Sequence, residues 1–486
     1  MNVREILYIL SKLCAFLAAI LAVPLLMAVY YGEYGGMRAF VLTISCSCVL
    51  GFLLRRYGET GNWRNVSLRE GIGTVFFAWI LSAAVSGLPY IFIGALDPVS
   101  AFFESMSGLT TTGATTIPDL DVIPKSVLFW RSFTHWIGGI GIIVLFVAVL
   151  PQMSGNAVYL FNAEVSGFAS NRILPRIRST AVALFYIYLL MTIILTGILV
   201  GFGMTEYDAV NHAFSAVATG GFSTYNDSVA HFHSVPIEFF LGVFMILAGG
   251  NFALYYHVTQ VGVKALWRDA EFKSYIIILA VITLLITLNI VWVNGLSLTE
   301  GLRHAFFQVA SFGSTTGYVS YGYDTWPAFS KLLMAVTYLV GGCAGSTAGG
   351  VKVCRFVVLV KTVTAELRRT MHPSMLLTVY YGGRRLPIGT ILNISRFFFL
   401  YVMVVASLAI IVTAGGLPVE EAIFGVAACI SSVGPAFGEI GATGNFSQVS
   451  DIGKLAFSMA MLLGRLELFT ALVLLRREFW YSNNHW

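Results

Sequence analysis

Long apolar segments recur from one end of the chain to the other, separated by short polar stretches. Most of them match the roughly 20 helical residues needed to cross a bilayer core. The segments are 5–31, 37–54, 71–97, 127–150, 182–203, 236–262, 274–295, 329–361, 391–414 and 453–475. The pattern predicts ten membrane-spanning helices. We expect the first to be retained, because it lacks a small-residue cleavage site and is too long for a signal-peptide core.

Four shorter windows between these segments share one pattern. Each has an alanine, a glycine twelve residues later, and a hydroxyl side chain two residues before that glycine. The windows read AFFESMSGLTTTGA, AVNHAFSAVATGGF, AFFQVASFGSTTGY and AIFGVAACISSVGP, beginning at Ala101, Ala209, Ala305 and Ala422. Their glycines, Gly113, Gly221, Gly317 and Gly434, are 108, 96 and 117 residues apart. This near-regular period predicts a fourfold internal repeat. The alternative, that small residues merely line helix interfaces, explains scattered glycines but not their phase.

Each repeat therefore consists of a span, a short apolar segment of about a dozen residues, a hydroxylated glycine stretch and a second span. A dozen residues are too few to cross a bilayer, so the short segment is predicted to be re-entrant. Non-helical backbone at membrane depth survives only where it is buried in protein or lines a water-filled cavity. Four such stretches around one axis would form a ring of carbonyl oxygens, which is how a pore replaces the hydration shell of a potassium ion.

Composition and charge place the chain in a membrane. Of its 486 residues, 57% are hydrophobic and 11% are charged, against roughly 25% charged in soluble domains. The net charge of +5 is concentrated in alternate loops, which the positive-inside rule makes cytoplasmic, together with both termini. The basic residues of these loops are Arg55, Arg56, Arg64, Arg69, Arg172, Arg176, Arg178, Lys264, Arg268, Lys273, Lys361, Arg368, Arg369, Arg384, Arg385, Arg476 and Arg477. The other loops are acidic, which either concentrates cations or only reflects the exclusion of bases.

Disulfides and metal centres are not expected. The six cysteines lie in apolar or glycine-rich stretches without CxxC spacing. His231 and His233 form an HxH pair that could bind a metal, but no third ligand is nearby in the sequence. We expect this pair to lie in a solvated loop.

In combination, several motifs resemble the TrkH-type membrane subunits of potassium uptake systems, within the Trk/Ktr/HKT superfamily. They are SLREG at 67–71, FFESMSGLTTTGAT, GGFST, GGCAGSTAGGVKV and GRLELFT, and the resemblance covers nearly the whole chain. It implies an all-α polytopic membrane protein with four tandem helix–pore-helix–helix repeats around a central pseudo-fourfold pore, preceded by two extra transmembrane helices. The implied organisation is 1–66 for those helices, then repeats 67–165, 166–265, 266–372 and 373–486.

The resemblance also assigns the potassium-selective filter residue by residue. The implied filter is Thr110, Thr111, Thr112, Gly113, Ala218, Thr219, Gly220, Gly221, Ser314, Thr315, Thr316, Gly317, Ser431, Ser432, Val433 and Gly434. In plant relatives a serine at the first filter glycine accompanies sodium preference, so Gly113 implies potassium permeation. Pro435 departs from the aromatic residues, Phe222 and Tyr318, that follow the glycine in the second and third repeats.

The longest span contains GGCAGSTAGG at 341–350, which is predicted to open the helix into a loop because each interior glycine costs roughly 1 kcal/mol. Val351 separates the last glycine from Lys352, so the Walker pattern for nucleotide binding does not fit. The resemblance implies an intramembrane loop that obstructs the path below the filter. The gating residues assigned to it are Gly345, Ser346, Thr347, Ala348, Gly349 and Gly350. Lys352 either acts with this loop or snorkels.

Two charged residues of the last span, Arg465 and Glu467, are costly enough in a membrane to suggest function. On a straight helix they would not share a face. We expect Arg465 to face the path as a barrier to cations, while Glu467 pairs elsewhere. The alternative is that Arg465 neutralises a buried acid on another helix.

The expected function is potassium uptake across the bacterial inner membrane, without covalent chemistry and with potassium as the cargo. The resemblance implies a homodimer and a cytosolic ring of TrkA-type subunits that carries the nucleotide; no organic cofactor is expected on this chain. The alternative is an ion-coupled secondary transporter, for potassium with protons or sodium or, less favoured, for an organic solute. The repeats, however, share one orientation instead of the usual inverted arrangement. An enzyme would need convergent titratable groups. The candidates, scattered among the repeats, are Glu104, Arg131, His135, His212 and His304.

Overall fold

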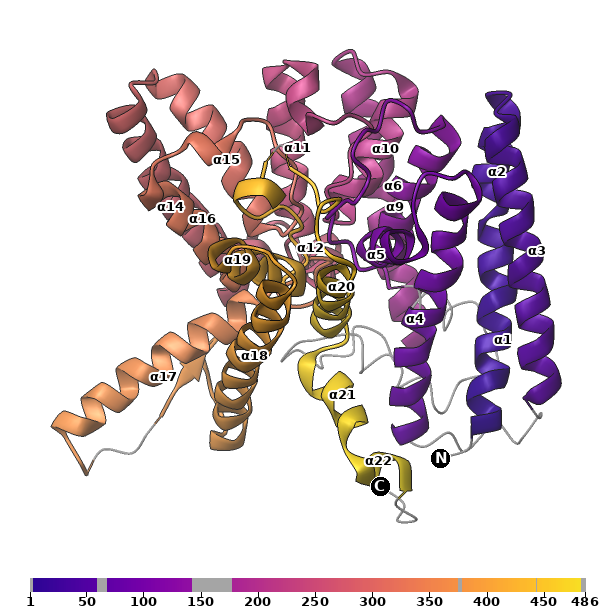
Figure 1. Cartoon of the computed structure of the whole chain (residues 1–486). Helices are drawn as coiled ribbons and strands as arrows, with labels where there is room; N and C mark the ends of the chain where they lie inside the picture. Colours follow the sequence, from indigo (N-terminus) through magenta and orange to yellow (C-terminus); the bar gives the residue numbers. More distant parts are fainter. Residues whose placement is uncertain (1–2, 59–67, 142–176, 375–377, 443, 482–486) are drawn as a thin grey trace.

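The computed structural model describes residues 3–58, 68–141, 177–374, 378–442 and 444–481. Within these ranges the chain is helical apart from its loops and one small hairpin, in which β1 (Tyr380–Tyr381) pairs antiparallel with β2 (Arg384–Arg385). The prediction of an all-α fold is confirmed. Figure 1 shows α1 beginning, and the last helix α22 lying, at the same end of the helix bundle.

Two membrane-length segments precede the repeats. The first combines α1 (Val3–Ile20) and α2 (Ala22–Tyr30), and the second is α3 (Tyr34–Tyr57). The two pack side by side at one edge of the molecule (Figure 1). The Glu33 carboxylate between them accepts hydrogen bonds from the Lys125 and Ser126 amides at 2.7 and 3.0 Å. It thereby caps the start of a repeat helix and ties the N-terminal pair to the main body.

Four repeats follow, each with a long helix, a short helix and a second helix. The long helices are α4 (Leu68–Phe92), α9 (Ile177–Gly201), α14 (Ala270–Asn294) and α18 (Ile388–Ala414). The short helices are α5 (Pro98–Leu109), α10 (Glu206–Val217), α15 (Leu298–Gly313) and α19 (Val419–Ile430). The second helices are α6 (Lys125–Gly139), α11 (Val235–Ala248), α16 (Ala328–Val340) and α20 (Asp451–Arg465).

Side chains explain where the short helices begin. The Asp97 carboxylate accepts from the amides of Val99 and Ser100, and the Thr205 hydroxyl accepts from the Asp208 amide. Ser297 makes a capping box with Glu300. Such caps satisfy amides that a helix start leaves free, and they let a helix of about a dozen residues begin inside the bundle.

Three predicted spans are interrupted. The prediction that 329–361 opens into a loop is confirmed, because α16 ends at Val340 and α17 (Val353–Met371) begins after a break of twelve residues. The predicted spans 236–262 and 453–475 are not straight, continuous helices. A bend of 92° separates α11 from α12 (Phe252–Val261), and one of 118° separates α20 from α21 (Leu468–Leu472). The first bend follows Gly249 and Gly250, where the Asn251 side chain caps α12; the second has Glu467 at a φ of 59°.

The remaining elements are short. They are α13 (Lys264–Arg268), α22 (Arg477–Tyr481), and the 3-10 helices η2 (Ser228–Phe232), η3 (Tyr323–Thr325), η4 (Gly438–Ile440) and η5 (Val473–Leu475). Figure 1 shows α17 projecting away from the bundle. Of the expected repeat boundaries, 265/266 falls within α13 and 372/373 follows α17.

Some predictions fall outside the described residues. They concern the span 127–150 beyond residue 141, the basic residues Arg64, Arg172 and Arg176, and the boundaries 66/67 and 165/166. In the part of the chain that is described, six helices are long and apolar enough to cross a membrane, and the two bent pairs pass the same test. The long helices α14 and α18 turn rows of large apolar side chains outward, as lipid-facing helices do. The chain is thus a multi-pass membrane protein.

Candidate functional site: a ring of four glycine segments in contact with the loop 345–350

The four predicted glycine segments, 110–113, 218–221, 314–317 and 431–434, meet in a closed ring. The ring is visible in how tightly each glycine packs against the next repeat. A Cβ added to Gly113 would lie 2.1 Å from the Gly220 carbonyl oxygen, one on Gly221 2.1 Å from that of Thr316, one on Gly317 2.0 Å from that of Val433, and one on Gly434 2.4 Å from that of Thr112. Each glycine faces the carbonyl that precedes the next glycine, and the fourth faces the first. No side chain fits at any of the four positions.

The four segments also share one backbone conformation. The glycines have φ values of 82°, 83°, 85° and 87°, and the hydroxyl residue two positions earlier has φ values of 55°, 56°, 59° and 56° in Thr111, Thr219, Thr315 and Ser432. Glycine takes such angles freely. A threonine or serine does so at a cost of roughly 1–2 kcal/mol. The fourfold repeat that the sequence predicts is therefore present in the backbone angles.

The ends of the short helices fix these angles. In each repeat the amide of the segment's third residue donates to a carbonyl five residues earlier, at 2.9, 2.8, 2.7 and 2.8 Å in chain order. The amide of the second residue donates to a carbonyl three residues earlier, at 3.2, 3.2, 3.1 and 3.1 Å. This is the Schellman pattern, with its left-handed residue just past the helix. Each short helix therefore ends at the ring and directs the partly negative end of its dipole towards it.

Hydrogen bonds within and behind the ring hold it in place. In the first repeat the Thr110 and Thr112 hydroxyls lie 2.9 Å apart, and in the third the Ser314 and Thr316 hydroxyls lie 2.8 Å apart. In the fourth, Ser431 pairs with the Tyr401 hydroxyl at 2.9 Å. In these three repeats, every hydroxyl at the first or third position of the segment therefore has a hydrogen-bond partner.

The structure links three of the titratable candidates behind the second segment. The buried guanidinium of Arg131 bonds the Glu104 carboxylate at 2.6 Å and the Ser223 carbonyl oxygen at 2.9 Å. The Ser223 hydroxyl meets the His212 ring at 3.0 Å. Arg131 also lies 3.7 Å from the centre of the Phe222 ring. Each group has a structural partner, so the cluster braces the residues after Gly221.

His135 and His304, the other two candidates, lie apart from that hydrogen-bonded cluster. The His135 ring bonds the Gly108 carbonyl oxygen at 2.8 Å and packs 4.1 Å from Phe222. His304 packs against Tyr321 with ring centres 4.3 Å apart.

The predicted gating loop lies directly against one side of the ring. The Gly349 amide donates to the Thr315 hydroxyl at 2.7 Å, and a Cβ on Gly349 would lie 2.1 Å from the Ser431 carbonyl oxygen. The Thr347 hydroxyl lies 3.3 Å from both the Val217 and the Ala248 carbonyl oxygens. The loop thus touches the second, third and fourth repeats. Lys352 is buried and donates to the Ala348 carbonyl oxygen, so it belongs to the loop and does not snorkel.

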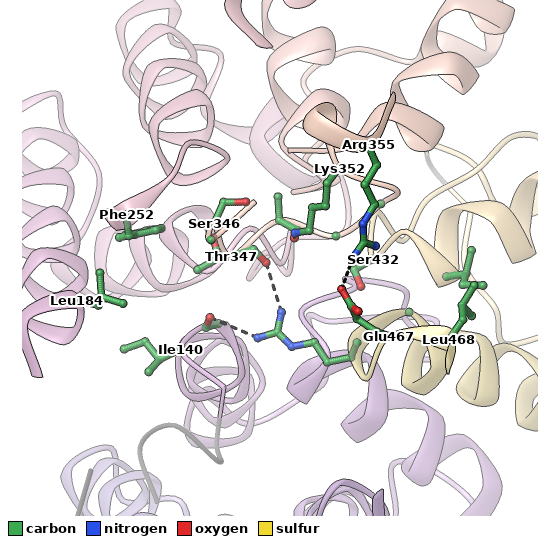
Figure 2. Close-up of a pocket in the computed structure, with 18 of the residues that line it drawn as sticks. Ile140, Leu184, Phe252, Ser346, Thr347, Lys352, Arg355, Ser432, Glu467 and Leu468 are labelled. Atoms are coloured by element: carbon green, nitrogen blue, oxygen red, sulfur yellow. Dashed lines mark hydrogen bonds and ion pairs between the residues drawn. The ribbon is translucent and has the colours of Figure 1, made fainter. Parts of the chain in front are cut away.

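Arg465 lies on the same side of the ring. It is the last residue of α20, in the place that Gly139 has at the end of α6. Its guanidinium donates to the Thr347 carbonyl oxygen at 3.4 Å and to those of Gly138 and Gly139 at 2.5 and 3.3 Å. Figure 2 shows these bonds reaching Thr347 on one side and the chain beside Ile140 on the other. Arg465 therefore joins the loop to the first repeat, the one that the loop's own contacts omit.

Glu467 pairs elsewhere, as predicted. Its carboxylate binds Arg355 at 2.6 Å (Figure 2), and Arg355 also stacks 4.2 Å from the Phe397 ring. The straight helix assumed for Arg465 and Glu467 is wrong, because the chain turns between them. The ion pair joins α17 to the start of α21.

Cavities lie on both sides of the ring. The first, of about 160 Å³, is lined by Gly345–Gly350, Lys352, Arg465 and Ser432. The second, of about 110 Å³, is lined by Gly113, Gly221, Gly317 and Pro435, with Arg131 at its wall. Pro435, which departs from the aromatic pattern, lines the second cavity. The ring separates the two spaces.

The HxH pair makes no metal site among the described residues, where no group of three His, Cys, Asp or Glu side chains could hold an ion. His231 stacks on Tyr225 with ring centres 3.7 Å apart and lies 3.4 Å from the Asp227 carboxylate. Its side chain is half exposed, as expected for a solvated loop.

Sequence reasoning missed several residues that contact the site. Tyr401 and Arg355 lie within the predicted spans 391–414 and 329–361, where sequence reasoning did not single them out. Glu271 was also missed, although an acid within the basic segment 264–273 is a departure from the charge pattern that the sequence itself shows. Its carboxylate reaches the two ends of the loop.

The fold and the ring define a class: an all-α, multi-pass membrane transport protein with four repeats around one axis. The family model described as "TrkH: Cation transport protein" matches residues 36–482. The chain therefore belongs to the TrkH family of cation transport proteins.

Relatives and a solved structure agree over the full length. The chain is 37% identical to the Trk system potassium uptake protein TrkH of Salmonella typhimurium and 36% identical to that of Escherichia coli strain K12, in each case over 99% of this chain and 100% of the relative. The crystal structure of the potassium transporter TrkH from Vibrio parahaemolyticus superposes with a TM-score of 0.89, at 35% identity, covering 99% of this chain and 100% of that one. The family consists of transport proteins, not enzymes.

Proposed function

We propose that this protein takes up potassium through a channel-like pore, with the ring of glycine segments as its selectivity filter. The closed glycine-to-carbonyl contacts among the four repeats carry the proposal. A ring of backbone carbonyls replaces the water shell of a potassium ion. The proposed filter is 110–113, 218–221, 314–317 and 431–434, and potassium passes through it as cargo.

The ends of the four short helices support a cation in this position. Their C-terminal dipoles converge on the ring, and a converging partial negative charge favours a cation. The buried Arg131 beside the second cavity is paired with Glu104 at 2.6 Å. The carboxylate offsets the positive charge of Arg131, so this charge does not exclude cations from the cavity. Gly113 keeps the first filter position free of a side chain.

The gate is proposed to be the loop 345–350 with Lys352 and Arg465. The loop contacts the filter hydroxyl of Thr315, and Arg465 completes its attachment to the first repeat. A buried lysine and an arginine next to a cation path repel cations. Opening requires the loop to move away from the ring.

The assembly around the pore is also part of the proposal. Both termini lie in the cytoplasm of a bacterium and the chain spans its inner membrane, because the basic loops fall on the side of the termini. The organisation is two N-terminal helices (1–66) and repeats 67–165, 166–265, 266–372 and 373–486. The working unit is a homodimer that binds TrkA-type nucleotide-binding subunits on its cytoplasmic face.

A symport mechanism coupled to protons or sodium is the second candidate. The loop that blocks the ring on one side favours it, since a path closed on one side is what alternating access needs. The four repeats in one orientation favour the channel. An uptake rate that follows the potassium gradient alone, with no dependence on a proton or sodium gradient, supports the channel.

Replacing Arg465 tests the gate. Arg465→Ala removes both the positive charge and the link between the loop and α6, so rubidium uptake into proteoliposomes should rise by about tenfold without any nucleotide-binding partner, the factor that about 1.4 kcal/mol gives. Arg369→Ala, an exposed arginine on α17, is the matched control and should leave uptake unchanged. An unaltered rate in Arg465→Ala contradicts the gate.

A further inference from the structure

Glu271 binds both ends of the loop from outside the path. It is the second residue of α14, the first helix of the same repeat. One carboxylate oxygen, Oε1, accepts the Ala344 amide at 2.7 Å and the Cys354 amide at 3.3 Å. Those two amides bracket the segment 345–350 that lies against the ring. A single side chain therefore fixes the distance between the two ends of the loop.

The start of α17 needs this acceptor. The N-cap residue of α17 is Lys352, whose side chain cannot accept a hydrogen bond and provides no cap. The comparable start of α12 is self-sufficient, since Asn251 accepts from the Ala253 and Leu254 amides. Amides left without acceptors are costly at membrane depth. Glu271 thus supplies from another helix the cap that α17 lacks, and its negative charge suits a helix start.

Backbone hydrogen bonds also hold the two ends of the loop together. The Val353 amide donates to the Gly342 carbonyl oxygen at 3.0 Å, and the Cys343 amide donates to that of Gly249 at 2.8 Å. Lys352 itself takes a φ of 79°, a strained angle for a residue with a side chain. Strain of this kind persists only while surrounding contacts hold it. Without the carboxylate, the base of the loop is free to open.

The chain just before Glu271 is exposed. Trp267 and Val263 are 62% and 65% exposed, and Lys264 and Arg268 are exposed as well. Asp269 starts α14 by accepting the Phe272 amide at 2.8 Å, so α13 and Glu271 are joined by one short, capped connection. A displacement of α13 is transmitted to the carboxylate within three residues.

We infer that Glu271 is a positioning residue that clasps the gating loop shut and links it to the exposed segment 261–268. The inference rests on the proposed gating function of the loop. Movement of that segment, by a bound partner or otherwise, withdraws the carboxylate from Ala344 and Cys354. The loop then loses its closed base and leaves the ring.

The test measures rubidium uptake by the full chain in proteoliposomes, without a partner. Glu271→Ala removes the acceptor and should raise uptake by about fivefold, a shift smaller than one charge-assisted hydrogen bond provides. Glu271→Gln keeps one acceptor oxygen and should restore most of the closure. The ratio of rubidium to sodium uptake should stay that of the unaltered protein, because the ring itself is unchanged.

A matched control separates gating from general destabilisation. Glu238→Ala removes another buried, hydrogen-bonded carboxylate, which binds Arg303 and joins α11 to α15. It should lower thermal stability without raising uptake. If Glu271→Ala cannot be purified, Glu271→Asp takes its place, since the shorter side chain cannot span both amides.

The outcomes also separate this inference from the proposed gate. If rubidium uptake rises in Arg465→Ala but in no Glu271 variant, the clasp is wrong and the proposed gate is retained. If rubidium uptake rises in no variant of either residue, the proposed gate is wrong. A rise in Glu271→Ala accompanied by lost rubidium-over-sodium preference shows that Glu271 supports the ring and not the loop, and the clasp is then wrong.

Discussion

Single residues with unusual backbone angles mark the ring. Glycine could occupy the left-handed positions of Thr111, Thr219, Thr315 and Ser432 without strain, yet all four repeats carry a hydroxyl there. A strain of roughly 1–2 kcal/mol at each is a reason to look for a compensating role. In the proposed filter, cation coordination by the hydroxyl and its carbonyl is that role. In this structure Thr315 already accepts a bond from the loop, so the loop that we propose as the gate occupies one of these oxygens.

Gly113→Ser tests the ring at a single residue. Its Cβ would lie 2.1 Å from the Gly220 carbonyl oxygen, so the ring has to shift and the oxygens lose their spacing. Rubidium-over-sodium preference in proteoliposome uptake should fall by about tenfold, equivalent to about 1.4 kcal/mol of lost discrimination. Gly94→Ser is the control, because Gly94 has a similar φ of 75° with nothing within 4 Å. An unchanged preference in Gly113→Ser removes the first repeat from the filter.

At the scale of elements, ion pairs hold helices of different repeats together around the ring. Arg303 on α15 binds Glu238 on α11 through two bonds of 2.6 and 2.7 Å, and joins the third repeat to the second. Arg355 on α17 joins the third repeat to Glu467 in the fourth. Short helices of about a dozen residues have little surface of their own. Their positions therefore depend on such contacts between repeats.

Glu238→Ala should weaken the contact between the second and third repeats, and neither Glu238 nor Arg303 lies in the glycine segments or in the loop 345–350. Glu238 is 4% exposed and Arg303 30% exposed, so the pair is partly shielded from water. A two-pronged bond of this kind contributes about 2 kcal/mol, and the melting temperature in detergent should fall. Glu366→Ala, which breaks a pair with side chains 49% and 55% exposed, should change stability by less than about 0.5 kcal/mol. Equal melting temperatures for both variants would mean that the Glu238 pair is not structural.

At the scale of the whole molecule, the sequence predicts the repeats but not the bends. The spacing from Ala101 to Gly113 and its three counterparts was sufficient to place every short helix and every glycine segment, because both depend on local residue types. The bends at Gly249–Asn251 and at Glu467 were missed, because a straight helix and a broken one have the same apolar pattern in the sequence. Glu271 was missed for another reason. Its partners are the backbone amides of Ala344 and Cys354, which are 73 and 83 residues away. A pattern of side-chain types does not predict such contacts.

The same charge pattern predicts how the whole molecule lies in the membrane, and labelling can test it. Val122, 74% exposed, lies between α5 and α6, and the exposed Arg384 lies in the hairpin after α17. The basic loops make the Arg384 side cytoplasmic. In a chain whose exposed Cys46 and Cys48 are replaced by alanine, a membrane-impermeant maleimide added to intact cells should label Val122→Cys and not Arg384→Cys. Permeabilised cells should label both. Labelling of Arg384→Cys in intact cells would mean that the chain has the opposite orientation. The loop and Arg465 would then face the outside, where a cytosolic nucleotide-binding ring could not reach them.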